Sequence, residues 1–156
     1  MADLIDVNIE GVDEVVKRLQ SLTSDQAKRA MRSSVRVGAK EIQKLAVSFV
    51  TRSDDPRTPE NIGKNLIVKT GGARAERKHG GLVMRVGVLG GAQEGPGDEQ
   101  HKGGDTFYWR FLEFGTSRMH ARPFMRPAAE QGGQAAVNAI IRDLPKKIDR
   151  VLKTVV

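Results

Sequence analysis

The chain has 156 residues, which is enough for one domain with a core of its own and too few for two comfortable ones. Lysine and arginine number 26 against 19 acidic residues, and the resulting formal charge of +7 favours an anionic partner, either nucleic acid or an acidic protein surface. The absence of cysteine excludes disulfides, thiol catalysis and thiolate metal sites.

The N-terminal residues carry acids rather than the basic region of a secretory signal. No apolar run approaches the roughly 18 residues of a membrane span, so we expect a soluble protein that stays inside the cell that makes it. Residues 4–9 alternate apolar and polar side chains and predict a strand. From Val12 the apolar spacing becomes helical and predicts a short helix.

A long helix is predicted over residues 25–50. Thr23 and Gln26 have the spacing of a capping box at its start. Its apolar and small residues recur every three or four positions, which favours a central core helix and leaves an exposed oligomerisation helix as the alternative. This seam consists of Ala27, Met31, Val35, Gly38, Ile42, Leu45 and Phe49.

The middle of the chain predicts two strands separated by flexible loops. Residues 65–70 and 82–89 alternate as strands do. The segments 51–63, 71–81 and 90–104 are rich in proline, glycine or charge, and we expect them to be loops that become ordered only on assembly.

Aromatic residues gather in one segment near the C-terminal helix. Residues 107–115 contain the only Trp, the only Tyr and three of the five Phe residues. This area could anchor either a core or an interface. Gly115 predicts a turn with positive φ, and Pro127 suits the first turn of a last helix that Gly132-Gly133 and Pro145 should bend or interrupt.

Glu113 is the one carboxylate in this aromatic neighbourhood. We expect a structural role, because a buried charge needs a partner. The partner would be an arginine, or else the carboxylate would tie down the Gly115-Thr116 turn. The arginines near in sequence are Arg110, Arg118, Arg122 and Arg126.

The sequence contains no pattern that supports catalysis or a cofactor. The three histidines lie far apart in loops without metal-ligand spacing, so no metal is expected. Neither a dinucleotide-binding glycine motif nor a P-loop is present, and no serine stands in a nucleophile elbow. We therefore expect a protein that is not an enzyme.

Basic clusters leave nucleic-acid binding open as an alternative function. Arg74, Arg77 and Lys78 are possible contacts to anions. A second cluster on the last helix is interleaved with Asp143 and Asp149, and no nucleic-acid-binding motif is readable. Solvated faces are the favoured explanation of both clusters.

Two motifs together resemble a known family. Tyr-Trp-Arg-Phe-Leu-Glu-Phe-Gly-Thr over residues 108–116 and Ala-Arg-Pro-Phe-Met-Arg-Pro-Ala over residues 121–128 are similar to the tailed-phage minor tail components typified by gene product ten of lambdoid siphophages. His120 stands where that family often has proline. The block that carries the resemblance, which we expect to form an interface or structural site, comprises Tyr108, Trp109, Glu113, Phe114, Gly115, Thr116, Arg122, Pro123, Phe124 and Pro127.

The resemblance implies a virion structural protein that completes the tail or joins it to the head at the neck. It implies a ring-like homo-oligomer whose partners are connector or stopper proteins, the tail terminator or the tail tube. DNA passing through the channel is a further possible contact, and no membrane is involved. The protein would occupy the host cytoplasm during assembly and the virion afterwards. The expected fold is a single α+β domain over residues 1–156, with three or four mostly antiparallel strands packed against the long helix and the C-terminal helix.

Overall fold

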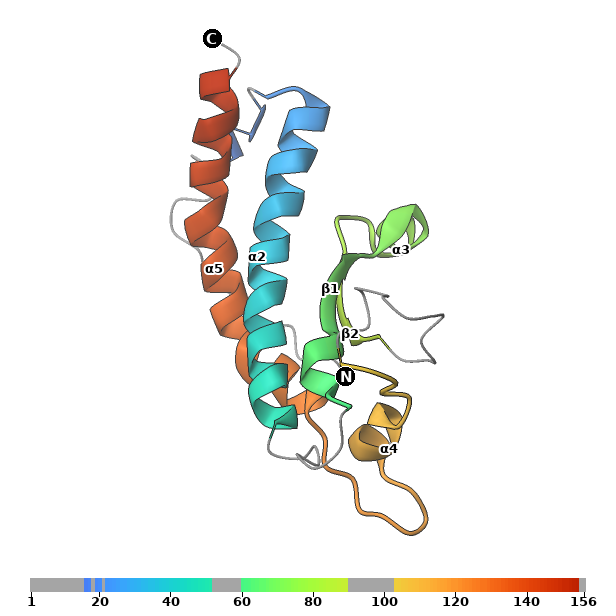
Figure 1. Ribbon diagram of the computed structural model, residues 1–156. Coiled ribbons are helices and arrows are strands. Elements are labelled where there is room, and N and C mark those ends of the chain that lie inside the picture. The colour runs from blue at the N-terminus through green and yellow to red at the C-terminus, as the bar shows by residue number, and fades with distance from the viewer. Residues whose placement is uncertain (1–15, 18, 21, 52–59, 90–102, 155–156) are drawn as a thin grey trace, which may run out of the picture.

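The computed structural model describes residues 16–17, 19–20, 22–51, 60–89 and 103–154. It shows an α+β arrangement in which two long helices lie side by side, with a β-hairpin on the other side of one of them (Figure 1). Helix α2 spans Ser24–Val50 and α5 spans Met125–Thr154. Helix α2 lies between α5 and the hairpin, so α5 packs mainly on α2 rather than on the strands.

Helix α2 begins where the sequence predicts. The side chain of Gln26 accepts a hydrogen bond of 3.2 Å from the backbone N–H of Thr23, as in the predicted capping box. The described residues 16–17 and 19–20 are helical, in agreement with the short helix predicted from Val12. The strand predicted at 4–9 lies outside the described residues.

Small residues allow α2 and α5 to approach closely. A Cβ atom built on Gly38 of α2 would lie 2.8 Å from the carbonyl oxygen of Ala136 and 2.7 Å from Cγ1 of Ile140 on α5. Farther along the same pair, the hydroxyl of Ser34 donates a hydrogen bond of 2.9 Å to Asp143. Helix α5 continues through Gly132-Gly133 and Pro145, so of the predicted bend or interruption the interruption is wrong; packing along α2 supports the continuous helix.

The described sheet has two strands. Strand β1 spans Leu66–Thr70 and pairs antiparallel with β2, Met84–Val88, in the register Leu66↔Val88 to Thr70↔Met84. Both strands were predicted, whereas a third or fourth strand is not found in the part of the chain that the structure describes. Alternation places Leu66 and Val68 on one face of the hairpin and Lys69 on the other.

The prediction of a flexible loop at 71–81 is wrong. Residues Gly72–His79 form a helix, α3, at the end of the hairpin (Figure 1). Ala75 is buried, and Gly80 ends the helix with φ 69° in the left-handed region. The cationic last turn of α3 also interacts favourably with the negative end of the helix dipole.

The other two predicted loops are only partly described. Residues 52–59 and 90–102 lie outside the described residues. The loop predicted over 51–63 is wrong at its C-terminal end, because a 3-10 turn, η1, spans Ile62–Asn65. Asn61 caps this turn by accepting the N–H of Lys64 at 2.9 Å. The loop predicted over 90–104 is also wrong at its C-terminal end, because Gly103 and Gly104 are hydrogen-bonded to the side chain of Asn65.

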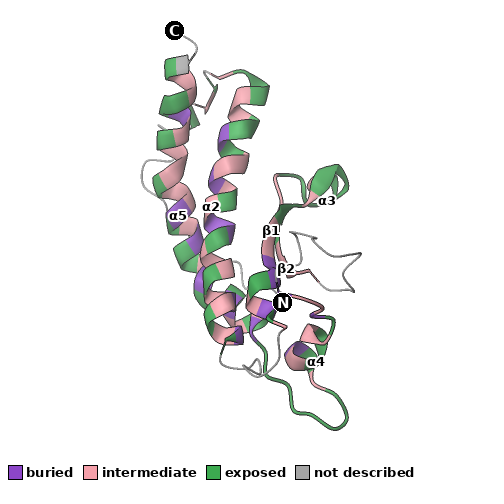
Figure 2. Ribbon diagram, viewed as in Figure 1, coloured by how far each residue is buried: buried purple, intermediate pink, exposed green. Residues whose placement is uncertain are grey.

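The core lies where α2, η1, β1 and the start of α5 meet. Its buried residues are Ala46, Val50, Ile62, Leu66, Phe124 and Ala128. Figure 2 shows buried residues between α2 and α5, whereas α3 and the loop after α4 are largely exposed. No helix in the described part of the chain is both long and apolar enough to span a membrane.

Candidate protein-interaction site

The aromatic segment divides between the core and the surface. Helix α4 spans Trp109–Phe114. Tyr108 and Trp109 pack against the core, and Arg110 lies over the Trp109 ring, with its Cζ 5.6 Å from the ring centroid. Phe107, Phe111 and Phe114 face outward and are 58, 48 and 66 % exposed. The predicted aromatic block therefore supplies both a core and a surface.

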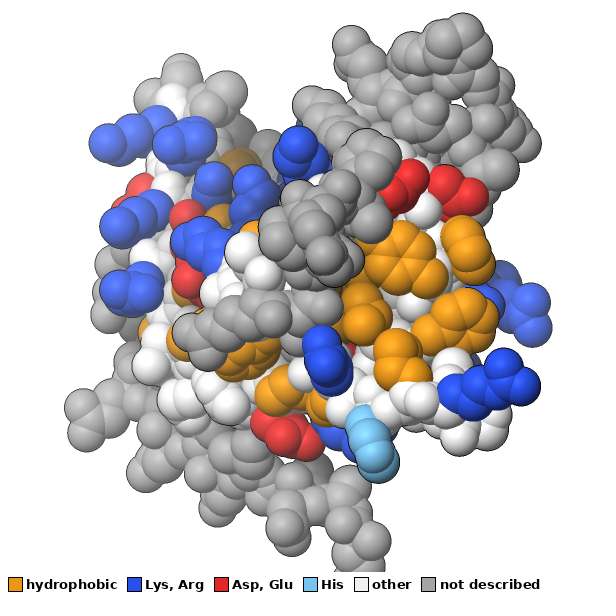
Figure 3. Space-filling model, turned by 60° about the horizontal axis from the view of Figure 1, so that its bottom comes forward, with side chains coloured by type: hydrophobic (Ala, Val, Ile, Leu, Met, Phe, Trp, Pro, Cys, Tyr) orange, Lys and Arg blue, Asp and Glu red, His pale blue; other side chains and the backbone are white. Residues whose placement is uncertain are grey.

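The outward side chains form an apolar patch. We call Phe107, Phe111, Phe114 and Met119 the α4 patch. The rings of Phe107 and Phe111 meet edge to face, with centroids 6.3 Å apart. Figure 3 shows hydrophobic side chains gathered on this face of the molecule, with cationic and acidic side chains at the margin. Exposed apolar clusters with a charged margin are typical of protein-interaction surfaces.

Glu113 anchors α4 to the start of α5. It is only 4 % exposed. One carboxylate oxygen accepts hydrogen bonds from the N–H groups of Phe124 at 2.8 Å and Met125 at 2.9 Å, and the other accepts from Arg126 at 3.1 Å. These three hydrogen bonds fit the expected structural role. The expected partners are wrong, because backbone donors rather than arginine side chains or the Gly115-Thr116 turn satisfy this carboxylate among the described residues.

The Glu113 carboxylate accepts hydrogen bonds from the N–H groups at the start of α5. The N–H groups at the start of a helix have no partner within the helix, and a carboxylate there also interacts favourably with the helix dipole. Pro127 follows Arg126 and has no N–H to satisfy. The next donor, Ala128, bonds to the carbonyl oxygen of Phe124 at 3.3 Å. The predicted position of Pro127 in the first turn is confirmed.

The loop between α4 and α5 is held by local hydrogen bonds. Gly115 has the predicted positive φ, 74°, and a Cβ there would lie 2.8 Å from the backbone nitrogen of Ala121. The Thr116 hydroxyl accepts from the N–H groups of Arg118 and Met119. Arg122 donates its N–H to Leu112 at 2.7 Å, while its side chain and Pro123 are exposed. Phe124, by contrast, is fully buried.

A buried polar cluster around Asn65 was not predicted. Its amide nitrogen donates to the carbonyl oxygen of Gly104 at 2.8 Å and to the Thr106 hydroxyl at 2.9 Å, and its oxygen accepts from Gly103 at 2.7 Å. The Thr106 hydroxyl donates to the carbonyl oxygen of Leu89. The partners lie 38 to 41 residues from Asn65, so no local pattern could reveal them. This cluster joins the hairpin to the segment that leads into α4.

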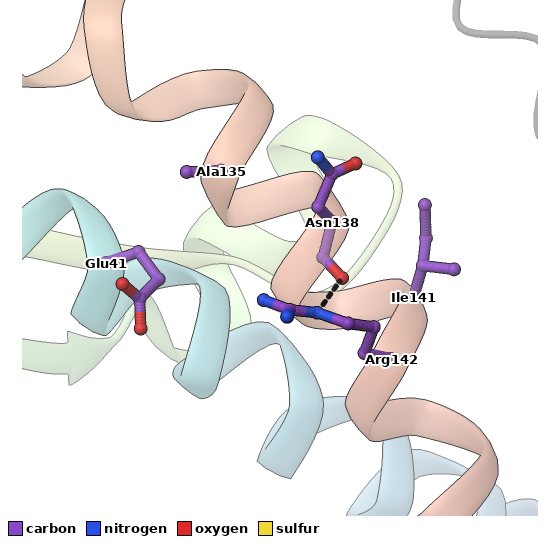
Figure 4. A pocket seen from close by; sticks show the side chains of 5 residues that line it. All are labelled: Glu41, Ala135, Asn138, Ile141 and Arg142. Atoms are coloured by element: carbon purple, nitrogen blue, oxygen red, sulfur yellow. Dashed lines mark hydrogen bonds between the residues drawn. The ribbon is translucent and has the colours of Figure 1, made fainter.

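Two of the depressions on the described surface are lined by residues of both long helices. The first, of about 440 Å³, is lined by Glu41 of α2 and Ala135, Asn138, Ile141 and Arg142 of α5 (Figure 4). Its charged groups are already bonded locally, because Glu41 pairs with Lys44 at 2.8 Å and Arg142 donates to the carbonyl oxygen of Asn138. The described residues contain no cluster of three or more potential metal ligands. This depression therefore shows no constellation for catalysis.

The second depression is apolar. It measures about 400 Å³ and lies between α2, α5 and the residues that lead into β2. We call it the apolar groove. It is lined by Val35, Gly38, Ala39, Ile42, His79, Leu82, Val83, Met84, Ala136 and Ile140.

A comparison with protein families places the chain in a known family. Residues 13–115 match the family model described as "Bacteriophage HK97-gp10, putative tail-component". The chain belongs to this HK97-gp10-like family of phage tail components. The match includes the aromatic segment through Gly115 and ends before the Pro-Phe motif. No curated protein and no solved structure shows significant similarity to the chain.

Proposed function

We propose that this protein is a structural, non-enzymatic component of the neck or upper tail, which completes the tail or joins it to the head through ring-like self-assembly. The α4 patch is the observation that carries this proposal. Its three phenylalanines are exposed although the chain contains few aromatic residues. Phe111 and Phe114 lie on helix α4, which Glu113 and the half-buried Trp109 hold in place, and Phe107 lies just before it. Rigid, exposed aromatic side chains are typical anchors of protein interfaces.

A closed ring of identical copies requires two different surfaces on each copy, because the contact runs head to tail. The α4 patch supplies one apolar surface, and the apolar groove supplies a second, concave one. We therefore propose that the α4 patch of one copy docks on the apolar groove of the next. Such a contact should persist as salt rises, because burial of apolar surface drives it.

The direct test removes the α4 patch without touching the core. The double variant Phe111→Ser/Phe114→Ser should keep the melting temperature of the wild type within a few degrees, because these side chains are about half exposed or more. It should lose self-assembly in sedimentation, and electron microscopy of a complemented phage should show unjoined heads and tails. Met31→Ser is the matched control, since Met31 is 37 % exposed on α2. Normal particles from the double variant would contradict the proposal.

A mixing experiment tests the head-to-tail contact. A groove variant, Leu82→Asp, should also fail to self-assemble. An equimolar mixture of the groove variant and the patch double variant retains one intact contact and should form a one-to-one complex and nothing larger. If neither variant associates with the other while each alone loses assembly, the patch and the groove are not partners.

A further inference from the structure

We propose that the hairpin and α3 form a binding surface for the phosphate backbone of duplex DNA, made by Lys69, Arg74, Arg77, Lys78 and Arg85. We call these five residues the cationic hairpin. This surface is separate from the α4 patch, since α3 and α4 lie at different ends of the hairpin (Figure 1).

The first argument is the charge of this segment. Residues 61–89 contain six lysines and arginines, the five of the cationic hairpin and Lys64, and all six are exposed. Glu76 is the only acid in the same stretch. Among the described residues, none of the five cations of the cationic hairpin forms an ion pair.

The second argument is the position of that single acid. Glu76 is turned toward α2, where its carboxylate pairs with the guanidinium of Arg32 at 3.1 Å. This ion pair offsets the negative charge of Glu76, the only acid of α3. The exposed side of α3 is therefore left with Arg74, Arg77 and Lys78.

The third argument is a like-charge pair in the sheet. Lys69 and Arg85 are directly opposite each other in the antiparallel register. Both are exposed, on the face of the hairpin opposite to Leu66 and Val68. Like charges at opposed positions destabilise a hairpin. A bound polyanion would remove that repulsion, so the cost in the free protein is consistent with a binding role.

The predicted ligand is nucleic acid rather than an acidic protein surface because phosphates are closely and regularly spaced along a duplex. Contacts to phosphates carry no sequence information, so the binding should not depend on base sequence. The inference does not rest on ring assembly. The variant Phe111→Ser/Phe114→Ser should bind DNA as the wild type does, which separates the failure of this proposal from failure of the proposed function.

The test measures fluorescence anisotropy of a labelled random duplex of about 30 base pairs in salt from about 50 to 200 mM. Five phosphate contacts predict a slope of log K against log salt of about −4.5 for the wild type. The triple variant Lys69→Gln/Arg77→Gln/Arg85→Gln should reduce the slope to about −1.8. The control Lys40→Gln/Lys146→Gln/Lys153→Gln makes the same charge change on α2 and α5 and should leave the slope unchanged.

Three results would overturn the proposal. The first is that the wild type does not bind the duplex. The second is that the salt slope falls as much in the control variant as in the triple variant. The third is that polyglutamate of equal charge competes as well as unlabelled DNA. The last result would indicate an acidic protein partner instead. The triple variant should melt within a few degrees of the wild type, because removal of the Lys69–Arg85 like-charge pair is stabilising whereas loss of Arg77 from the last turn of α3 is weakly destabilising. If it does not fold, Arg85→Gln alone should reduce the slope by about 0.9.

Discussion

The backbone N–H of Phe124 donates a hydrogen bond of 2.8 Å to the carboxylate of Glu113, across eleven residues of chain. The bond brings the end of α4 and the start of α5 together at the edge of the core. The same carboxylate also accepts hydrogen bonds from the N–H groups of Met125 and Arg126. Glu113 of α4 therefore caps α5, and the position of α4 depends on α5.

Loss of the Glu113 carboxylate should destabilise the protein. Glu113→Ala leaves buried donors without acceptors and should lower the free energy of unfolding by roughly 3 kcal/mol. Glu113→Gln keeps one acceptor oxygen and should cost less. Denaturant unfolding measures both. If Glu113→Gln folds and assembles normally but abolishes a hydrolytic or nuclease activity of the protein, the structural role is wrong.

Phe124→Ala should cost about 3–5 kcal/mol, because its ring is fully buried and the cavity would lie within the core. Phe124→Leu, which keeps most of the volume, should cost clearly less. Phe114→Ala serves as the control, since its ring is largely exposed and should change stability little. Equal losses for Phe124→Ala and Phe114→Ala would contradict the burial seen here.

Helix packing predicts opposite effects for two glycine substitutions. Gly38→Ala should destabilise by about 1–3 kcal/mol, because the new methyl group would meet the backbone of α5. Gly133→Ala should stabilise by up to about 1 kcal/mol, because no atom lies within 4 Å of its Cβ position and alanine favours the helix. Melting temperatures that move in the same direction would show that the contact between α2 and α5 is looser than described.

The Asn65 cluster gives a further comparison. Asn65→Ala should lower the free energy of unfolding by about 3 kcal/mol or more, since buried groups on Gly103, Gly104 and Thr106 lose a partner. Asn61→Ala removes an exposed cap of η1 and should cost about 1 kcal/mol. In a hydrogen-exchange experiment, the Gly103 amide should exchange faster in Asn65→Ala than in the wild type, and at the wild-type rate in Asn61→Ala. Unchanged protection there would mean that another group holds this amide.

The elements that periodic side chains define could be predicted from the sequence, and those that depend on tertiary contacts could not. The spacing of apolar residues predicted α2, α5 and both strands. Helix α3 was missed because its eight residues bury only Ala75 and show no apolar face. The partners of Glu113 were missed because four nearby arginines offered a plausible ion pair, whereas backbone donors leave no mark in the sequence.

The same distinction applies to the candidate sites. The aromatic cluster was visible in the composition, but only the structure separates Trp109, which packs inward, from Phe111, which faces outward. Arg74, Arg77 and Lys78 were recognised as a possible anion-contacting group. Lys69 and Arg85 were not, because their opposition depends on the strand register.

Asn65 binds the chain on both sides of residues 90–102. Its backbone oxygen accepts the N–H of Leu89 at 2.9 Å, and its side-chain oxygen accepts the N–H of Gly103 at 2.7 Å. One residue thus fixes how far apart Leu89 and Gly103 lie. Doubling the length of a closed loop costs only about 0.6 kcal/mol. The position is therefore suited to grafting, and an affinity tag or fluorescent peptide inserted there should leave the hairpin and both long helices undisturbed.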